Sequence, residues 1–206
     1  MRRIMPLLLM LPMLACLSAC PESVTERKSY KEPMTGEDKP LAFKARTLGY
    51  IKRPPELGKY VCEGLETQLQ DRYIHHKQYS AAFILKTLSE LPATLQNTYA
   101  TCYLEAELKE EGFGEYFNIN QAFLGPQALA GYKAFGAVNQ IKILAKALEL
   151  GKLKPKTAKD KTALAKELAK LDLQWAALDP KQLLALRGDY SRRRFDAGEW
   201  PTTDKR

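Results

Sequence analysis

The stretch that decides the fold is residues 157–196, "TAKDKTALAKELAKLDLQWAALDPKQLLALRGDYSRRRFD", which holds two helix starts in succession. Thr157 and Asp160 have the spacing of a capping box, in which two side chains accept backbone N–H groups of the first turn. Asp179 precedes Pro180, so a capping carboxylate is followed by a residue whose fixed φ suits the first helical position. The stretch therefore predicts two consecutive helices separated by a sharp stop.

Helix boundaries of the same kind recur upstream of this stretch. Pro92 begins a predicted helix that stops at Gly112. Pro126 begins another, which ends before Gly136, and Gly151 stops the helix after it. Further upstream, apolar residues at helical spacing predict one long helix or two short ones: Leu65, Leu69, Tyr73, Tyr79, Phe83 and Leu88. Because no strand-like alternation with hairpin turns is present, the sequence predicts an all-α fold, a single bundle of about five to seven helices.

The composition is that of a globular chain with a basic excess. Of the 206 residues, 45% are hydrophobic and 27% are charged, and the formal net charge is +8. This balance is typical of folded domains, and the positive charge makes anionic partners worth considering. With two histidines, four cysteines and no Cys-x-x-Cys pair, the sequence predicts no metal site and no cofactor.

The first residues have the layout of an export signal. A basic start is followed by an apolar block, residues 4–17, which two prolines interrupt and which is too short to span a membrane. The block ends in Leu17-Ser18-Ala19-Cys20, which resembles the lipobox of bacterial lipoproteins. We expect residues 1–19 to be a lipoprotein signal peptide and Cys20 to be lipidated; the alternative is an ordinary signal peptide with an incidental cysteine. Pro21 replaces the Asp that marks inner-membrane retention, which favours the periplasmic face of the outer membrane over the inner membrane.

Three segments follow the predicted signal. Residues 20–60 are rich in Pro, Lys, Glu, Ser and Thr, and they predict the lipidated cysteine and a flexible tether that ends at Pro54-Pro55. Part of this tether, around residues 41–51, could instead pack on the domain. Residues 61–198 predict the helical domain, and residues 199–206 predict a C-terminal tail.

Two cysteines remain in the predicted mature protein besides Cys20. Cys62 and Cys102 form an even pair, which in an oxidising compartment indicates a disulfide. The alternative is two separate buried thiols, with Cys102 forming part of the apolar face of its helix.

The segment "EAELKEEGFGEYFNIN", residues 105–120, resembles the signature of the DNA-mimic-protein-19-like family. The usual pattern there is a helix ending in Glu-x-Asn-Asn-Gly-Gly-Phe, then x-Gln-Tyr-Phe and soon an Asn. The matching positions are Glu107, Gly112, Phe113, Tyr116, Phe117 and Asn118 or Asn120. The sequence departs from the pattern where charged residues replace its polar ones: Lys109, Glu110, Glu111 and Glu115. The likeness extends roughly from Leu65 to Asp196 and implies membership of a family of largely unknown function.

Two interpretations of this segment stay open. In the structural one, Gly112 ends a helix, since a left-handed backbone is inexpensive for glycine, and the aromatic residues after it fill the core. In the functional one, four residues form a possible binding surface: Glu107, Tyr116, Asn118 and Asn120.

The named member of the family is an acidic protein whose surface imitates DNA phosphates for a DNA-binding partner. That role transfers poorly to a basic, exported chain, and nucleic acid is not expected as a partner. One acidic group does remain near Lys109, either as an anion-mimicking patch or as a solvated helix end: Glu105, Glu107, Glu110, Glu111 and Glu115.

Positive charge is concentrated later in the chain. Residues 151–170 hold seven lysines against two acidic residues, and a run of three arginines follows. The candidate basic patch consists of Lys152, Lys154, Lys156, Lys159, Lys161, Arg192, Arg193 and Arg194. Such lysines usually form a solvated helix face, and the sharper hypothesis is contact with lipid headgroups or lipopolysaccharide phosphates.

No catalytic signature is present in the sequence, so we do not expect an enzyme. The leading hypothesis is a membrane-anchored periplasmic lipoprotein whose helical domain binds an envelope protein. Two alternatives stand beside it. One is an immunity-type lipoprotein that neutralises a toxin acting in the periplasm, and the other is a structural envelope protein that contacts anionic lipid headgroups.

Overall fold

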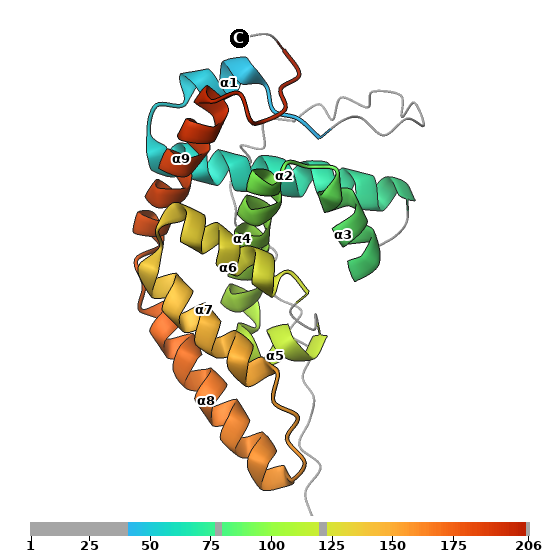
Figure 1. The fold of residues 1–206 in the computed structure, drawn as a ribbon, viewed down its shortest axis with the longest axis vertical. Helices are drawn as coiled ribbons and strands as arrows, with labels where there is room; N and C mark the ends of the chain where they lie inside the picture. The colour runs from blue at the N-terminus through green and yellow to red at the C-terminus, as the bar shows by residue number, and fades with distance from the viewer. Residues whose placement is uncertain (1–40, 77–79, 120–122, 205–206) are drawn as a thin grey trace, which may run out of the picture. The chain divides into compact units, whose positions relative to one another are not determined.

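The computed structural model describes residues 41–76, 80–119 and 123–204 (Figure 1). The first helices in these ranges are α1 (Ala45–Tyr50), α2 (Pro54–His76), α3 (Ala81–Ser89), α4 (Ala93–Glu110) and α5 (Gly112–Ile119). The remaining helices are α6 (Gly125–Phe135), α7 (Val138–Gly151), α8 (Ala158–Ala176) and α9 (Pro180–Asp196). Within the described residues, the single β-type pairing is an isolated bridge between Phe43 and Thr202. The predicted all-α class is therefore confirmed.

Both helix starts predicted for residues 157–196 are present. The hydroxyl of Thr157 accepts the backbone N–H of Asp160 at 3.1 Å, and the carboxylate of Asp160 accepts that of Thr157 at 3.3 Å. The carboxylate of Asp179 accepts the backbone N–H of Lys181 at 2.9 Å. These side chains satisfy N–H groups that have no partner inside a first helical turn, so α8 and α9 begin where the sequence places them.

The described part of the chain has more helices than the five to seven expected, because short helices occur where stops or loops were predicted. Gly112 is one such stop, with a φ of +72° that favours glycine. Gly112 is itself the first residue of α5, so α5 follows α4 with one residue, Glu111, between them. Of the two alternatives predicted for the region around residue 80, one long helix or two shorter ones, the structure shows two helices, α2 and α3.

The structure places residues 41–60, which the sequence assigned to the tether, in the folded body. Pro54 and Pro55 are the first residues of α2 rather than the end of a linker, since the fixed φ of proline also suits a first helical turn. The alternative that residues 41–51 pack on the domain is the one observed, with Leu48 fully buried. Residues 1–40, including the predicted signal peptide and Cys20, lie outside the described residues.

Residues 41–50 and 200–204 together form what we call the terminal clasp. The backbone N–H of Phe43 donates to Pro201 O at 3.0 Å, and that of Thr203 donates to Phe43 O at 2.8 Å. The carboxylate of Asp204 accepts the backbone N–H of Ala45 at 2.6 Å, which caps the start of α1. A stacked ring pair, Phe43 with Trp200, closes the clasp, and Trp200 is 3% exposed. The residues predicted as a C-terminal tail are thus packed as far as residue 204.

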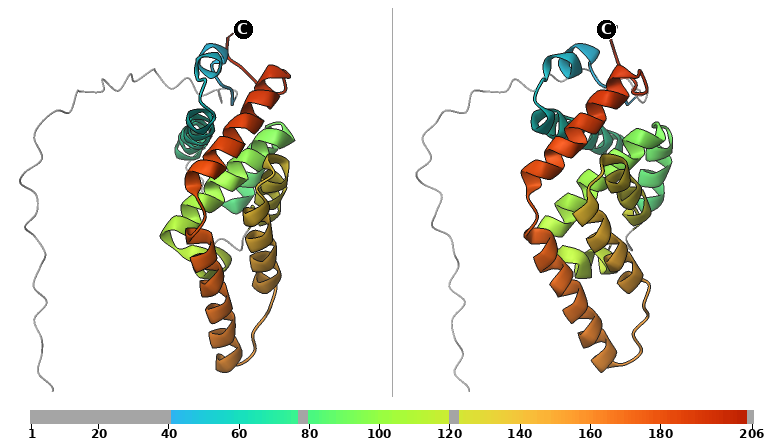
Figure 2. Two further views of the ribbon diagram at one scale, coloured as in Figure 1. Left: turned by 90° about the vertical axis from the view of Figure 1, so that its left-hand side faces the viewer. Right: turned by 60° about the vertical axis from the view of Figure 1, so that its left-hand side comes forward.

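The helices assemble around α4, which packs against α2, α6 and the short α5 (Figure 1). Helices α8 and α9 follow one another along one side of the body, and α9 crosses α2 (Figure 2). The crossing is close because it uses glycine. A Cβ atom on Gly188 of α9 would lie 1.7 Å from Pro54 O of α2. Side chains larger than hydrogen therefore cannot be accommodated there without moving one helix.

Candidate functional site

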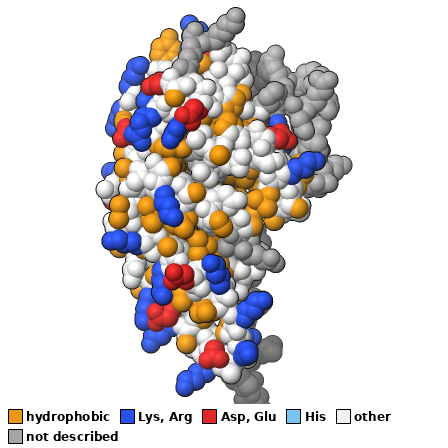
Figure 3. All heavy atoms as spheres, viewed as in Figure 1, with side chains coloured by type: hydrophobic (Ala, Val, Ile, Leu, Met, Phe, Trp, Pro, Cys, Tyr) orange, Lys and Arg blue, Asp and Glu red, His pale blue; other side chains and the backbone are white. Residues whose placement is uncertain are grey.

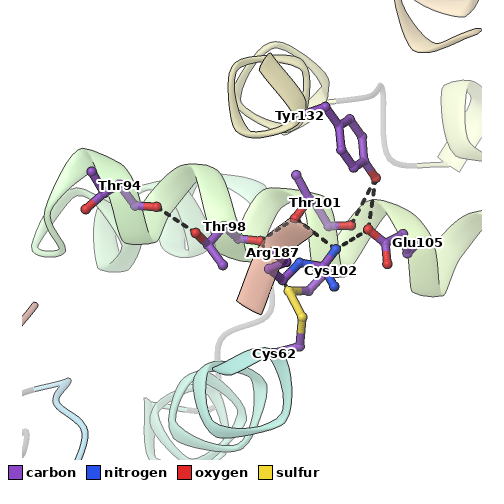
Figure 4. Close-up of a disulfide and its surroundings, with 8 residues drawn as sticks. All are labelled: Cys62, Thr94, Thr98, Thr101, Cys102, Glu105, Tyr132 and Arg187. Carbon is purple, nitrogen blue, oxygen red and sulfur yellow. Dashed lines mark hydrogen bonds and ion pairs between the residues drawn. A yellow bond between two sulfur atoms is a disulfide. The ribbon is translucent and has the colours of Figure 1, made fainter. Parts of the chain in front are cut away.

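A cluster of polar side chains is buried where α4, α6 and α9 meet (Figure 4). We call it the buried polar cluster; its members are Thr101 and Glu105 of α4, Tyr132 of α6 and Arg187 of α9. Arg187, whose side chain is 1% exposed, donates from Nη2 to Glu105 Oε1, and also to Thr101 Oγ1 at 3.2 Å. The hydroxyl of Tyr132 donates to Glu105 Oε1 at 3.1 Å. Glu105 is thus the acceptor that joins the three helices.

Burial dominates the electrostatics of this cluster. It raises the pKa of Glu105 above the ordinary value, while the charge and hydrogen bond of Arg187 act in the opposite direction. Burial, followed by the nearby charge of Glu105, raises the pKa of Tyr132 well above its ordinary value. Tyr132 therefore keeps its proton and remains a hydrogen-bond donor throughout the neutral range.

A cavity of about 440 Å³ lies beside this cluster, at the junction between α8 and α9. Glu105 belongs to both features, since it lines the cavity and its side chain is 26% exposed. Apolar side chains form much of the wall, and they include Leu108, Trp175, Leu178 and Leu183. The charged lining residues are Glu105, Asp172, Asp179 and Lys109. The cavity therefore combines an apolar wall with three carboxylates and one ammonium group.

The wall of this cavity is fixed by contacts made on its outer side. The carboxylate of Asp172 accepts the backbone N–H of Phe113 at 2.8 Å and so attaches α8 to the start of α5. The ring of Trp175 packs edge-on against Phe113 and Tyr132, with centroids 5.9 and 5.7 Å apart. Asp179 is held as the cap of α9. Since each of these residues has a structural partner, the cavity is pre-formed.

Cys62 of α2 and Cys102 of α4 are joined in a disulfide, as the sequence predicts, with their Cα atoms 5.7 Å apart. Cys102 is adjacent to Thr101 in α4, so the disulfide lies directly beside the buried polar cluster (Figure 4). It ties α2 to the helix that carries Glu105.

The structure does not bring the four predicted binding residues together on one exposed surface. Tyr116 is fully buried, and burial raises the pKa of its hydroxyl. Glu107 is half-buried and its charge acts on Tyr116, whereas Asn118 is exposed on α5. Asn120 lies outside the described residues. For Tyr116, together with the buried Phe113, the structural interpretation of the segment is the one observed.

The candidate basic patch is divided between the start of α8 and the end of α9, which lie at opposite ends of the described body (Figure 1). The five lysines are all exposed around the loop before α8 and its first turn. Arg192, at the far end of α9, instead donates to the backbone carbonyls of Leu48, at 2.8 Å, and Ile51. Arg194 pairs with Glu199 at 2.8 Å. These two arginines therefore hold neighbouring segments in place.

The buried polar cluster is the feature that sequence reasoning missed. Glu105 was assigned to a solvated or anion-mimicking acidic group, and Arg187 and Tyr132 were not singled out. One signal was available, because Arg187 sits in the otherwise apolar run "LLALRG", residues 183–188, where a charge facing the core needs a partner.

Fold and site together define an all-helical protein built around a buried ion pair and a side cavity. Among the described residues, no group of three metal-ligating side chains is present, and no helix is long and apolar enough to cross a membrane.

Residues 89–194 match the model of the family described as DMP19-like protein. The chain therefore belongs to the DMP19-like family. No curated protein and no solved structure matches it. The matched range covers α4 to α8 and α9 as far as residue 194, including the buried polar cluster, and leaves Cys62 outside.

Proposed function

We propose that this chain is a periplasmic lipoprotein, anchored through Cys20, whose helical body binds another protein of the cell envelope. The disulfide between Cys62 and Cys102 supports export, because disulfides persist in oxidising compartments and are rare in the cytosol. The lipobox-like sequence that ends at Cys20 supports lipid attachment. Attachment of two or more acyl chains would hold the protein stably at a bilayer surface.

The observation that carries the binding role is the cavity beside Glu105. Its volume of about 440 Å³ suits one or two inserted side chains rather than a large cofactor. Its apolar wall favours an apolar side chain. Glu105 is paired with Arg187, and the remaining excess of two carboxylates, Asp172 and Asp179, over Lys109 favours a neighbouring basic group. The partner that fits is an envelope protein with an exposed segment in which an apolar residue adjoins a lysine or arginine.

The anchor is tested by metabolic labelling with an alkyne-bearing palmitate in cells that express the full chain. We expect Cys20→Ser to abolish the label. Cys16→Ser is the matched control, because Cys16 lies four residues earlier in a poorer lipobox, and it should leave label and location unchanged. Undiminished labelling of Cys20→Ser would refute lipidation at this position.

The partner site is tested by placing a photo-crosslinking amino acid at Ala176, which is exposed and lines the cavity. Ala163, exposed on the same helix but away from the cavity, is the control position. We expect one discrete product from position 176, absent at position 163, whose crosslinked peptide contains a basic residue beside an apolar one. Lys109→Glu, which adds negative charge to the lining, should raise its yield. The same products from both positions, or an acidic crosslinked peptide, would contradict the proposed partner class.

A further inference from the structure

Five exposed lysines surround the start of α8, and their side chains form no ion pairs or hydrogen bonds among the described residues. We call this region, residues 152–161, the lysine tip; its lysines are Lys152, Lys154, Lys156, Lys159 and Lys161. Figure 3 shows several basic side chains at this end of the body, with a few acidic side chains between them. Elsewhere several surface lysines are paired, as Lys146 is with Glu149.

The acidic residues near the lysine tip are already engaged. Asp160 closes the capping box of α8 through its contact with Thr157. Glu167 accepts a hydrogen bond from Lys170 at 2.6 Å, and this contact lowers the pKa of Glu167. Asp160 keeps its negative charge while it caps the helix, so residues 152–161 carry a formal net charge of 5 − 1 = +4.

The form of the lysine tip fits an extended anionic surface better than a single bound anion. Its lysines are distributed along ten residues of chain, across a loop and the first helical turn. Leu153 lies between two of them and is 57% exposed, so an apolar side chain projects from the charged region. Residues 151–170 contain no aromatic side chain on which a nucleic-acid base could stack.

From these observations we propose that the lysine tip binds the phosphate-bearing surface of an anionic lipid bilayer, with Leu153 entering the interface. Lysines near an anionic bilayer each strengthen binding by about fivefold, through attraction to the negative surface potential. An apolar side chain among them adds burial at the headgroup boundary. The inference does not depend on lipidation of Cys20 or on a protein partner at the cavity. Its failure would therefore leave the proposed function unaffected, and failure of the proposed function would leave this inference unaffected.

The test uses the chain from residue 20 with Cys20→Ser, which cannot be lipidated and retains the whole compact unit, residues 38–206. Sedimentation with vesicles of phosphatidylcholine plus phosphatidylglycerol should show binding that is absent with phosphatidylcholine alone. The triple variant Lys152→Gln, Lys154→Gln and Lys156→Gln should bind these vesicles about 100-fold more weakly. A control with the same net charge, Lys44→Gln, Lys86→Gln and Lys133→Gln, removes exposed lysines elsewhere and should bind as the parent does.

Competitors separate a bilayer from other anionic ligands. Inorganic phosphate at constant ionic strength should leave vesicle binding unchanged, whereas release by phosphate alone would overturn the proposal in favour of a small-anion site. A single-stranded RNA bound more tightly than the anionic vesicles in the same buffer would also overturn it. The proposal would also be overturned if the protein did not bind the anionic vesicles, or if the triple lysine-tip variant and its control bound them equally.

Discussion

Arg187→Met is expected to lower the free energy of unfolding by about 3 kcal/mol, because it leaves the carboxylate of Glu105 without its cationic partner. The side chain of Arg187 is 1% exposed and that of Glu105 is 26% exposed, so water can replace only part of the lost hydrogen bonding to Glu105 and Thr101. Methionine fills a similar length of the core, which separates the loss of charge pairing from the loss of packing. Urea denaturation followed by circular dichroism measures the change.

Two further variants make this expectation specific to the ion pair. Adding Glu105→Gln to Arg187→Met removes the unpaired charge, so the double variant should regain part of the lost stability. Arg193→Met changes an exposed arginine of the same helix and should cost less than about 0.5 kcal/mol. If Arg187→Met is as stable as Arg193→Met, the ion pair does not stabilise the fold.

The second large effect is expected from the double variant Cys62→Ala and Cys102→Ala, which should lose about 4 kcal/mol of stability. The disulfide closes a loop across a sequence separation of 40, and a bond of that span restricts the unfolded chain by about this amount in the loop-entropy estimate. Such a loss is a large share of the roughly 5–15 kcal/mol that stabilises a typical domain. Denaturation curves of oxidised wild type and the double variant give the difference.

Reduction provides an independent check on the same bond. Wild-type protein in dithiothreitol should unfold at nearly the denaturant concentration of the double variant, whereas the double variant should not respond to the reductant. In intact cells, a maleimide reagent should label Cys62 and Cys102 only after reduction if the protein is exported. Identical curves for wild type with and without dithiothreitol would show that the bond contributes little.

Sequence reasoning succeeded where the signal is local. The caps at Thr157 and Asp179 depend on residues within one helical turn, and both are found as predicted. Gly112 was correctly placed at a helix end for the same reason. The disulfide could also be predicted from the sequence, because a chain with four cysteines offers few ways to pair them.

The features that were missed depend on residues distant in the chain. Glu105 and Arg187 are separated by 82 residues, so neither periodicity nor spacing indicates that they meet. The prolines of α2 gave the same local pattern as a stiff linker, and only packing against α9 distinguishes a helix start from a linker. Tyr116 was a candidate surface residue because its motif stood out, yet its side chain fills the core.

The terminal clasp has a consequence for the order in which the molecule can be completed. A ribosome makes α1 early, but the carboxylate that caps its start belongs to Asp204, and the guanidinium that holds its end belongs to Arg192. Helix α1 therefore gains these two partners only after residues 192 and 204 have been synthesised. A chain that stops before Arg192 would lack both contacts and would leave α1 undocked.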